Sequence, residues 1–190
     1  RVDRRQRQMC IRDRSIAVYC SSSNHIDEIF KEEARRVGRL LGQNKYKMIY
    51  GGGNMGLMGI ISNSSIEVGG EVYGVITNHL IDIEKKNESV NNLKIVNSMH
   101  ERKIEMFNNS DIFLIFPGGI GTLEEFFEVY SWKQMRIHEK PIIIYNFNNF
   151  WDDLITLINN LVKKNFAGEK MKEAYKVVNN YDDLEKILKK

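Results

Sequence analysis

The sequence predicts an α/β protein: a single domain with a Rossmann-like, doubly wound parallel sheet in a three-layer αβα arrangement. Short apolar runs typical of buried strands alternate with longer segments whose apolar residues recur at helical spacing. Glycine-rich turns follow two of the strands and lead directly into helices. At 190 residues and 42% hydrophobic composition, the chain is long enough for one well-buried domain and short for two.

Strands are expected at apolar runs that are bounded by turn residues. In chain order they are Ser15 to Cys20, Lys47 to Tyr50, Glu71 to Ile76, Leu93 to Val96, Ile112 to Phe116, Pro141 to Tyr145 and Val177 to Val178. The run from Ile112 to Phe116 is apolar throughout, which indicates a strand covered on both faces.

Helices are expected where apolar residues form one stripe along the helical period. In chain order they are Asp27 to Gln43, Leu57 to Val68, Met99 to Asn108, Thr122 to about Met135, Phe150 to Lys163 and Tyr181 to Leu188. The residues expected to face inward include Ile29, Met99, Ile104, Leu157 and Leu161. Together with the strands, these helices predict a parallel sheet with helices on both faces.

Residues 1–14 differ in composition from the rest of the chain. They hold six arginines against Asp3 and Asp13, a charge of +4, so the formal net charge of +3 leaves −1 for the remainder. A basic arm for nucleic acid is one interpretation. A disordered or non-native tail is the favoured one, because arginine gives way abruptly to lysine where the first strand begins. Residues 15–190 are then the folded domain, and no nucleic-acid partner is expected.

Composition argues against several other classes of protein. No apolar run approaches the roughly 18 residues of a membrane span, and no leader-like segment precedes the domain, so a cytoplasmic protein without a membrane partner is expected. Cys10 and Cys20 form no disulfide framework, and the histidines are scattered. Neither a disulfide nor a metal site is therefore expected.

The first glycine loop, Gly51-x-Gly53-x-x-Gly56, follows a strand and precedes a helix, as the dinucleotide-binding fingerprint does. The acidic residue that would hold a ribose hydroxyl is missing at the end of the next strand, which reads Val75-Ile76-Thr77-Asn78. No Gly-Lys-Ser/Thr follows either loop, so a Walker-type site is also excluded. The loop is left as either a phosphate-binding turn or a simple tight turn.

The second glycine loop lies within Asp111 to Met135 and carries the strongest functional signal. A strand stops at Pro117-Gly118-Gly119 and a helix begins nearby, which presents backbone N–H groups to an anion. Glu125 has two interpretations that both stay open. It closes a capping box if Thr122 is the N-cap, and it suits the stabilisation of an oxocarbenium-like transition state if a phosphosugar binds here. Glu124 is expected to be solvated or at the substrate's edge.

A second cluster of charges begins the helix at Met99-His100-Glu101-Arg102-Lys103. Two cations near a helix start oppose the macrodipole, at a cost of some tenths of a kcal/mol. An anion bound beside them would explain this placement, since a guanidinium grips phosphate with two donors.

Met99-x-x-Arg102-Lys103 followed by Pro117-Gly118-Gly119-x-Gly121-Thr122-x-x-Glu125 resembles the LOG family of cytokinin riboside 5′-monophosphate phosphoribohydrolases. Family members have often carried the label lysine decarboxylase. The resemblance covers Ser15 to about Phe166. It includes the first glycine loop, Trp132 and His138-x-Lys140-Pro141.

The resemblance implies a homodimer that hydrolyses the N-glycosidic bond of a purine nucleoside 5′-monophosphate without a cofactor or metal. It implies that Arg102 and Glu125 are the catalytic pair. The implied substrate-binding residues are Glu84, Met99, Lys103, Gly118, Gly119, Ile120, Gly121, Thr122, Ser21, Gly52 and Gly53. The helix around Trp132 and Met135 is the expected place for a dimer contact.

Two other functions are considered. A non-catalytic carrier of a nucleotide or pterin phosphate could use a similar glycine turn, and release of the base distinguishes the enzyme from it. Pyridoxal-dependent lysine decarboxylation would need a Schiff-base lysine with an aspartate partner for the pyridinium nitrogen, and the sequence offers no convincing pair. Adenine and N6-prenylated adenine both stay open as the base.

Overall fold

The computed structural model describes residues 14–189, so the expected tail lies outside the described residues except for Arg14. One parallel sheet of seven strands runs through the domain in the order β4-β3-β2-β1-β5-β6-β7, which confirms the predicted fold class. The strands are β1 Ser15–Tyr19, β2 Lys47–Tyr50, β3 Val72–Thr77, β4 Asn92–Val96, β5 Ile112–Ile115, β6 Ile142–Tyr145 and β7 Lys176–Val178.

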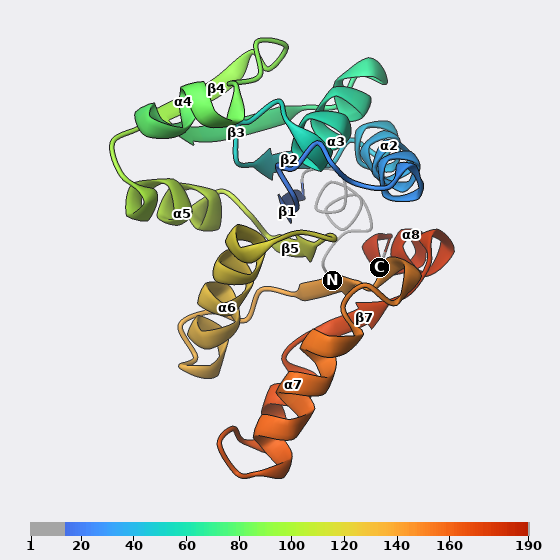
Figure 1. Ribbon diagram of the computed structural model, residues 1–190, viewed down its shortest axis with the longest axis vertical. Coiled ribbons are helices and arrows are strands. Elements are labelled where there is room, and N and C mark those ends of the chain that lie inside the picture. The colour runs from blue at the N-terminus through green and yellow to red at the C-terminus, as the bar shows by residue number, and fades with distance from the viewer. Residues whose placement is uncertain (1–13, 190) are drawn as a thin grey trace, which may run out of the picture.

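Helices cover both faces of this sheet (Figure 1). The α-helices are α2 Glu28–Gln43, α3 Gly56–Glu67, α4 Asn78–Glu84, α5 Met99–Asn108, α6 Ile120–Gln134, α7 Asp152–Lys163 and α8 Tyr181–Leu188. Two short 3₁₀ helices, η1 Phe147–Asn149 and η2 Glu169–Glu173, flank α7.

The core has two halves because successive residues of a strand point to opposite faces. In β1, Ile16 and Val18 pack with α2, α3 and α8, whereas Ala17 and Tyr19 pack with α5, α6 and α7. All of the strand pairings are parallel, and β5 residues Ile112 to Ile115 are fully buried. This double cover explains why the strands read as continuous apolar runs.

The switch in strand order lies between the neighbouring strands β1 and β5. The chain leaves β1 for α2 on one face of the sheet and leaves β5 for α6 on the other face. The loops after these two strands therefore diverge and leave a crevice at the carboxyl edge, which is where open α/β sheets bind ligands.

Helix α4 was not expected from the sequence, and the reason is its lack of a buried face. None of its residues is buried, and Ile83 is exposed. A further correction concerns the inward-facing residues, because Ile29, Met99, Ile104, Leu157 and Leu161 are all exposed. On α5 the buried positions are held by Arg102 and Met106 instead.

Within residues 14–189, no helix has the length and apolar character needed to cross a membrane. The cytoplasmic location stays a prediction.

Candidate active site

A cavity of about 300 Å³ opens at the carboxyl edge of the sheet, beside the switch point. The loop after β1, the first glycine loop, α4, α5 and the start of α6 all contribute to its walls. The predicted site residues that line it are Ser21, Glu84, Met99, Arg102, Gly119, Ile120, Gly121, Thr122 and Glu125. Further lining residues are Val18, Cys20, Ser22, Ser23, Gly51, Met58 and Glu124.

The remaining predicted site residues lie around the cavity. Gly118 lines a neighbouring cavity on the α2 side of the turn, and Gly52 and Gly53 are not among the residues that line the first cavity. Lys103 is turned toward α6, where it forms ion pairs with Glu124 and, at 3.0 Å, with Glu128. A direct substrate contact by Lys103 stays a prediction.

The start of α6 offers backbone donors to the cavity. Gly119 is the N-cap and supplies no side-chain acceptor, and the first helical bond runs from the Leu123 N–H to the Gly119 carbonyl at 3.0 Å. Among residues 14–189, no acceptor contacts the N–H groups of Ile120, Gly121 or Thr122. Three donors at the positive end of a helix dipole are the arrangement that favours an anion.

The helix begins three residues earlier than the capping-box interpretation requires, because the N-cap is Gly119 and not Thr122, so that interpretation is wrong. Thr122 is helical and buried, and Glu125 lies in the second turn. A Cβ on Gly118 would overlap the Thr122 side chain, which explains why glycine precedes the helix here. A similar arrangement caps α5, where the N-cap Ser98 Oγ accepts from the Glu101 N–H at 3.1 Å and Glu101 accepts from the N–H of Asn97, one residue before the N-cap, at 2.9 Å.

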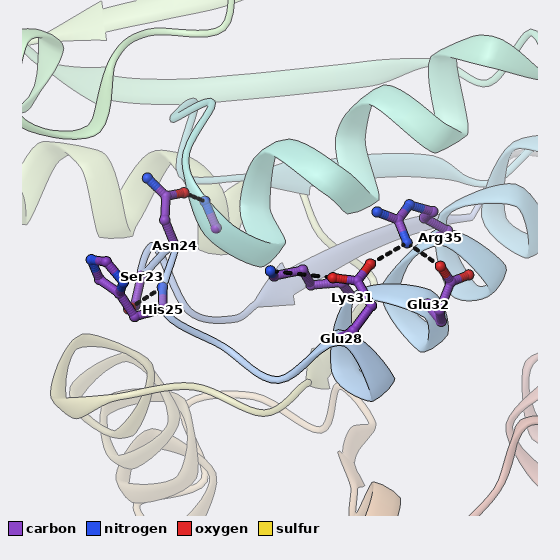
Figure 2. A network of polar contacts seen from close by, with 8 residues as sticks. Ser23, Asn24, His25, Glu28, Lys31, Glu32 and Arg35 are labelled. Carbon is purple, nitrogen blue, oxygen red and sulfur yellow. Dashed lines mark hydrogen bonds and ion pairs between the residues drawn. The ribbon is translucent and has the colours of Figure 1, made fainter.

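The start of α3, in contrast, has its donors already occupied. Asn24 Oδ1 accepts from the Gly56 N–H at 2.9 Å, and the Ser21 carbonyl accepts from the N–H groups of Leu57 and Met58 at 2.9 and 3.3 Å. Figure 2 shows Asn24 reaching from the loop after β1 toward the start of this helix. Of the two readings of the first glycine loop, the phosphate-binding one is therefore not supported.

The glycines of this loop make room for two side chains of the site. A Cβ on Gly51 would overlap Arg102 Nη2, and a Cβ on Gly53 would lie 3.1 Å from the Glu84 Cβ. The loop also holds Glu84 by its backbone, because the Asn54 N–H donates to the Glu84 carbonyl at 3.1 Å.

Arg102 lies at the centre of the site and is 5% exposed. Its Nε donates to the Val75 carbonyl at 3.0 Å and its Nη2 to the Gly51 carbonyl at 3.2 Å. Two carboxylates flank the guanidinium beyond hydrogen-bonding distance: Glu125 lies 3.7 Å from Nη1 and Glu84 lies 3.9 Å from Nη2. The backbone thus fixes the guanidinium while donors remain free to bind a ligand.

Burial changes the acidity of both carboxylates. It raises the pKa of Glu125 to about 7, although the positive charge of Arg102 opposes the shift. Burial also raises the pKa of Glu84, again against Arg102. Among the described residues, Glu84 Oε2 is buried without a hydrogen-bond partner. A carboxyl whose pKa lies near neutrality can give or take a proton at working pH.

Several lining residues were not identified from the sequence. Cys20 and Met58 are apolar wall residues, and burial raises the pKa of the Cys20 thiol well above its usual range. Cys20 follows β1 directly and Met58 follows the first glycine loop, and these positions were the sequence signal that could have identified them as lining residues. Within the described range, no three His, Cys, Asp or Glu residues are grouped in a way that could hold a metal ion.

Comparison with known proteins gives a consistent result. A family model described as "Possible lysine decarboxylase" matches residues 58–188. A probable cytokinin riboside 5′-monophosphate phosphoribohydrolase from Oryza sativa subsp. japonica is 38% identical over 157 residues, which cover 83% of this chain and 64% of that protein. A cytokinin riboside 5′-monophosphate phosphoribohydrolase from Arabidopsis thaliana is 36% identical over 173 residues, which cover 91% of this chain and 76% of that protein.

A solved structure with a similar fold is the molybdenum cofactor binding protein from Rippkaea orientalis. Its TM-score is 0.70 at 17% sequence identity, and the match covers 94% of this chain and 96% of that protein. At this identity the likeness extends to the fold alone.

Proposed function

Starting from the fact that this chain belongs to the LOG family of cytokinin riboside 5′-monophosphate phosphoribohydrolases, we propose that it hydrolyses the N-glycosidic bond of a purine nucleoside 5′-monophosphate. The products are the free base and ribose 5-phosphate. The observation that carries the proposal is the juxtaposition of a carboxylate, Glu125, and a fixed guanidinium, Arg102, with the free N–H groups that begin α6.

The start of α6 binds the 5′-phosphate in this proposal. Its N–H groups and helix dipole favour a dianion, and hydrogen bonds to a charged group contribute about 1.5–3 kcal/mol each. The phosphate then fixes the ribose over the second turn of the helix, which carries Glu125.

Glu125 acts on the ribose C1′. As bond cleavage proceeds, positive charge develops on the sugar, and an ionised carboxylate beside it stabilises that charge and takes a proton from the attacking water. Arg102 holds Glu125 in place and compensates its charge. Because the Arg102 guanidinium is itself fixed by two carbonyl groups, this arrangement exists before substrate binds.

The test is the release of base from AMP and from its N6-isopentenyl derivative, measured side by side by chromatography. We expect base release by the unmodified protein and a loss of about 100-fold or more in Glu125→Gln and Arg102→Gln. Glu88→Gln is the matched control, since that side chain is exposed and does not line the cavity. Normal activity in Glu125→Gln would contradict the assignment, and the ratio of the two substrates gives the base preference.

A carrier function would appear in the same experiment as tight nucleotide binding without release of base. The likeness to the molybdenum cofactor binding protein does not favour it, because the identity is only 17%.

A homodimer is part of the proposal. Met99 and Ile120 are exposed apolar residues at the mouth of the cavity, and Ile104 is exposed further along α5. Met135, which was expected at a dimer contact, is also exposed. Light scattering coupled to gel filtration measures the mass directly, and a monomer at micromolar concentration would exclude a stable dimer.

A further inference from the structure

We propose that Glu84 is a catalytic residue that protonates the purine base as it leaves. This inference rests on the proposed function and adds a third group to its mechanism. Three observations carry it: the position of Glu84 relative to the proposed phosphate site, its buried oxygen without a hydrogen-bond partner, and the presence of one cation between two carboxylates.

The position of Glu84 follows from how α4 ends. The helix stops at Glu84, and Lys85 turns the chain with a φ of 51°. The Asn54 N–H bonds to the Glu84 carbonyl and Gly53 packs against its Cβ, so the residue is fixed to the first glycine loop. Its side chain lines the cavity from the β3 side of the sheet.

The groups are arranged in sequence across the cavity. The proposed phosphate site lies at the start of α6, and Glu125 follows in the next turn of the same helix. Glu125 faces Nη1 of Arg102, whereas Glu84 faces Nη2, so Arg102 separates the two carboxylates. In the proposed binding mode the phosphate lies at the start of α6 and the ribose over Glu125, which leaves the Glu84 side of the same cavity for the base.

Glu84, Glu125 and Arg102 together carry two acidic groups and one positive charge, which favours the retention of one proton on the carboxylate pair. The titratable groups that face Glu84 are Arg102 from α5, Glu125 from α6 and Cys20 at the end of β1. Two carboxylates whose side chains are 16% and 11% exposed share the single positive charge of Arg102, so one of them can be ionised at low cost and the other keeps its proton toward neutral pH. The two groups titrate together, so the proton belongs to the pair. In the proposed reaction the positive charge that develops at C1′ favours the ionised form of Glu125, which leaves the proton on Glu84.

The reaction balances with this one proton. The bond from C1′ to the base breaks, and its electron pair goes to the base nitrogen. The Glu84 carboxyl donates its proton to the base, and Glu125 accepts a proton from the water that attacks C1′. Proton exchange with solvent after product release restores the starting state, and no other reactant is required.

Glu84→Gln tests the role when the leaving group is varied. With AMP, the base needs protonation, and we expect kcat/KM to fall about 100-fold or more. With p-nitrophenyl β-D-ribofuranoside 5-phosphate, the nitrophenolate leaves without a proton, and we expect kcat/KM to stay within about 3-fold of the unmodified protein. Equal losses on both substrates, or no loss on AMP, would overturn the inference.

Controls separate this role from a structural one. Glu88→Gln, in the loop that follows α4, should change neither rate, and circular dichroism checks that the variants are folded. Glu84→Asp keeps the acid but shortens its reach, so it should retain more AMP activity than Glu84→Gln. If Glu84→Asp has no activity with AMP and also none with the nitrophenyl substrate, Glu84 has a structural role. If the unmodified protein cleaves neither substrate, the proposed function is refuted. If the unmodified protein and Glu84→Gln cleave AMP equally well, only the role of Glu84 is refuted.

Discussion

Replacement of Glu125 by Gln should stabilise the protein at alkaline pH while it abolishes activity. The side chain is only 11% exposed, and burial raises its pKa from 4.5 to about 7. A carboxyl whose pKa is raised by folding destabilises the folded state when it ionises. The penalty is absent below the unfolded pKa and complete above the folded pKa. A difference of about 2.5 pKa units corresponds to about 3 kcal/mol.

The pH dependence makes this prediction specific. At pH 8.5, Glu125→Gln should gain about 3 kcal/mol, which corresponds to a rise in Tm of about 6–12 °C for a chain of this size. At pH 5 the gain should be below about 1 kcal/mol, because most of the penalty has not yet developed.

Thermal unfolding followed by circular dichroism at both pH values measures the effect, with urea titration to give free energies. Glu88→Gln, an exposed carboxyl, should change Tm by less than about 1 °C at either pH. A Glu125→Gln protein that is no more stable than the unmodified one at pH 8.5 would refute the electrostatic reasoning, and so would an equal gain at pH 5 and pH 8.5.

Three further predictions concern other parts of the molecule. Gly51→Ala should displace the Arg102 guanidinium and lower kcat/KM at least about 10-fold, whereas Gly168→Ala, where a Cβ meets open space, should not; steady-state kinetics of both variants decide this. Adenosine, which lacks the 5′-phosphate, should be cleaved at least about 100-fold less efficiently than AMP, and equal efficiency would show that the start of α6 does not bind phosphate. Tyr145→Phe should cost about 1–3 kcal/mol in urea unfolding, because the buried Glu33 then loses the hydroxyl that donates to it; an unchanged midpoint would contradict this.

Sequence periodicity was sufficient to predict the strands of the sheet and most of the helices, because strands buried on both faces and amphipathic helices leave strong patterns in the sequence. The family membership inferred from the two motifs was also confirmed. Helix α4 left no such pattern, since it buries none of its residues. Tertiary contacts join it to the first glycine loop, such as the bond from the Asn54 N–H to the Glu84 carbonyl, and such contacts leave no periodic pattern in the sequence.

The burial and hydrogen-bond partners of the charged site residues could not be predicted from the periodicity of the sequence. Arg102 occupies a position of α5 that a helical wheel would assign to an apolar residue, because the Val75 and Gly51 carbonyls compensate for its burial. Thr122 and Glu125 fit the capping-box spacing, yet Gly119 takes the N-cap position. The spacing cannot distinguish these starts, since Gly119, Gly121 and Thr122 are all compatible with a helix N-terminus.

The hydrogen bonds of Ser21 bear on how the site moves. Its N–H donates to the Pro117 carbonyl at 3.2 Å, and its carbonyl accepts from the first turn of α3. The loop after β1 therefore cannot swing away from the cavity without uncapping a helix and releasing the turn that precedes α6. Substrate entry should not wait for this loop to open, and the amide hydrogens of Leu57 and Met58 should exchange slowly with solvent. The loop after β1 is thus tied to both glycine turns, and any gating of the proposed site should come from elsewhere around the cavity.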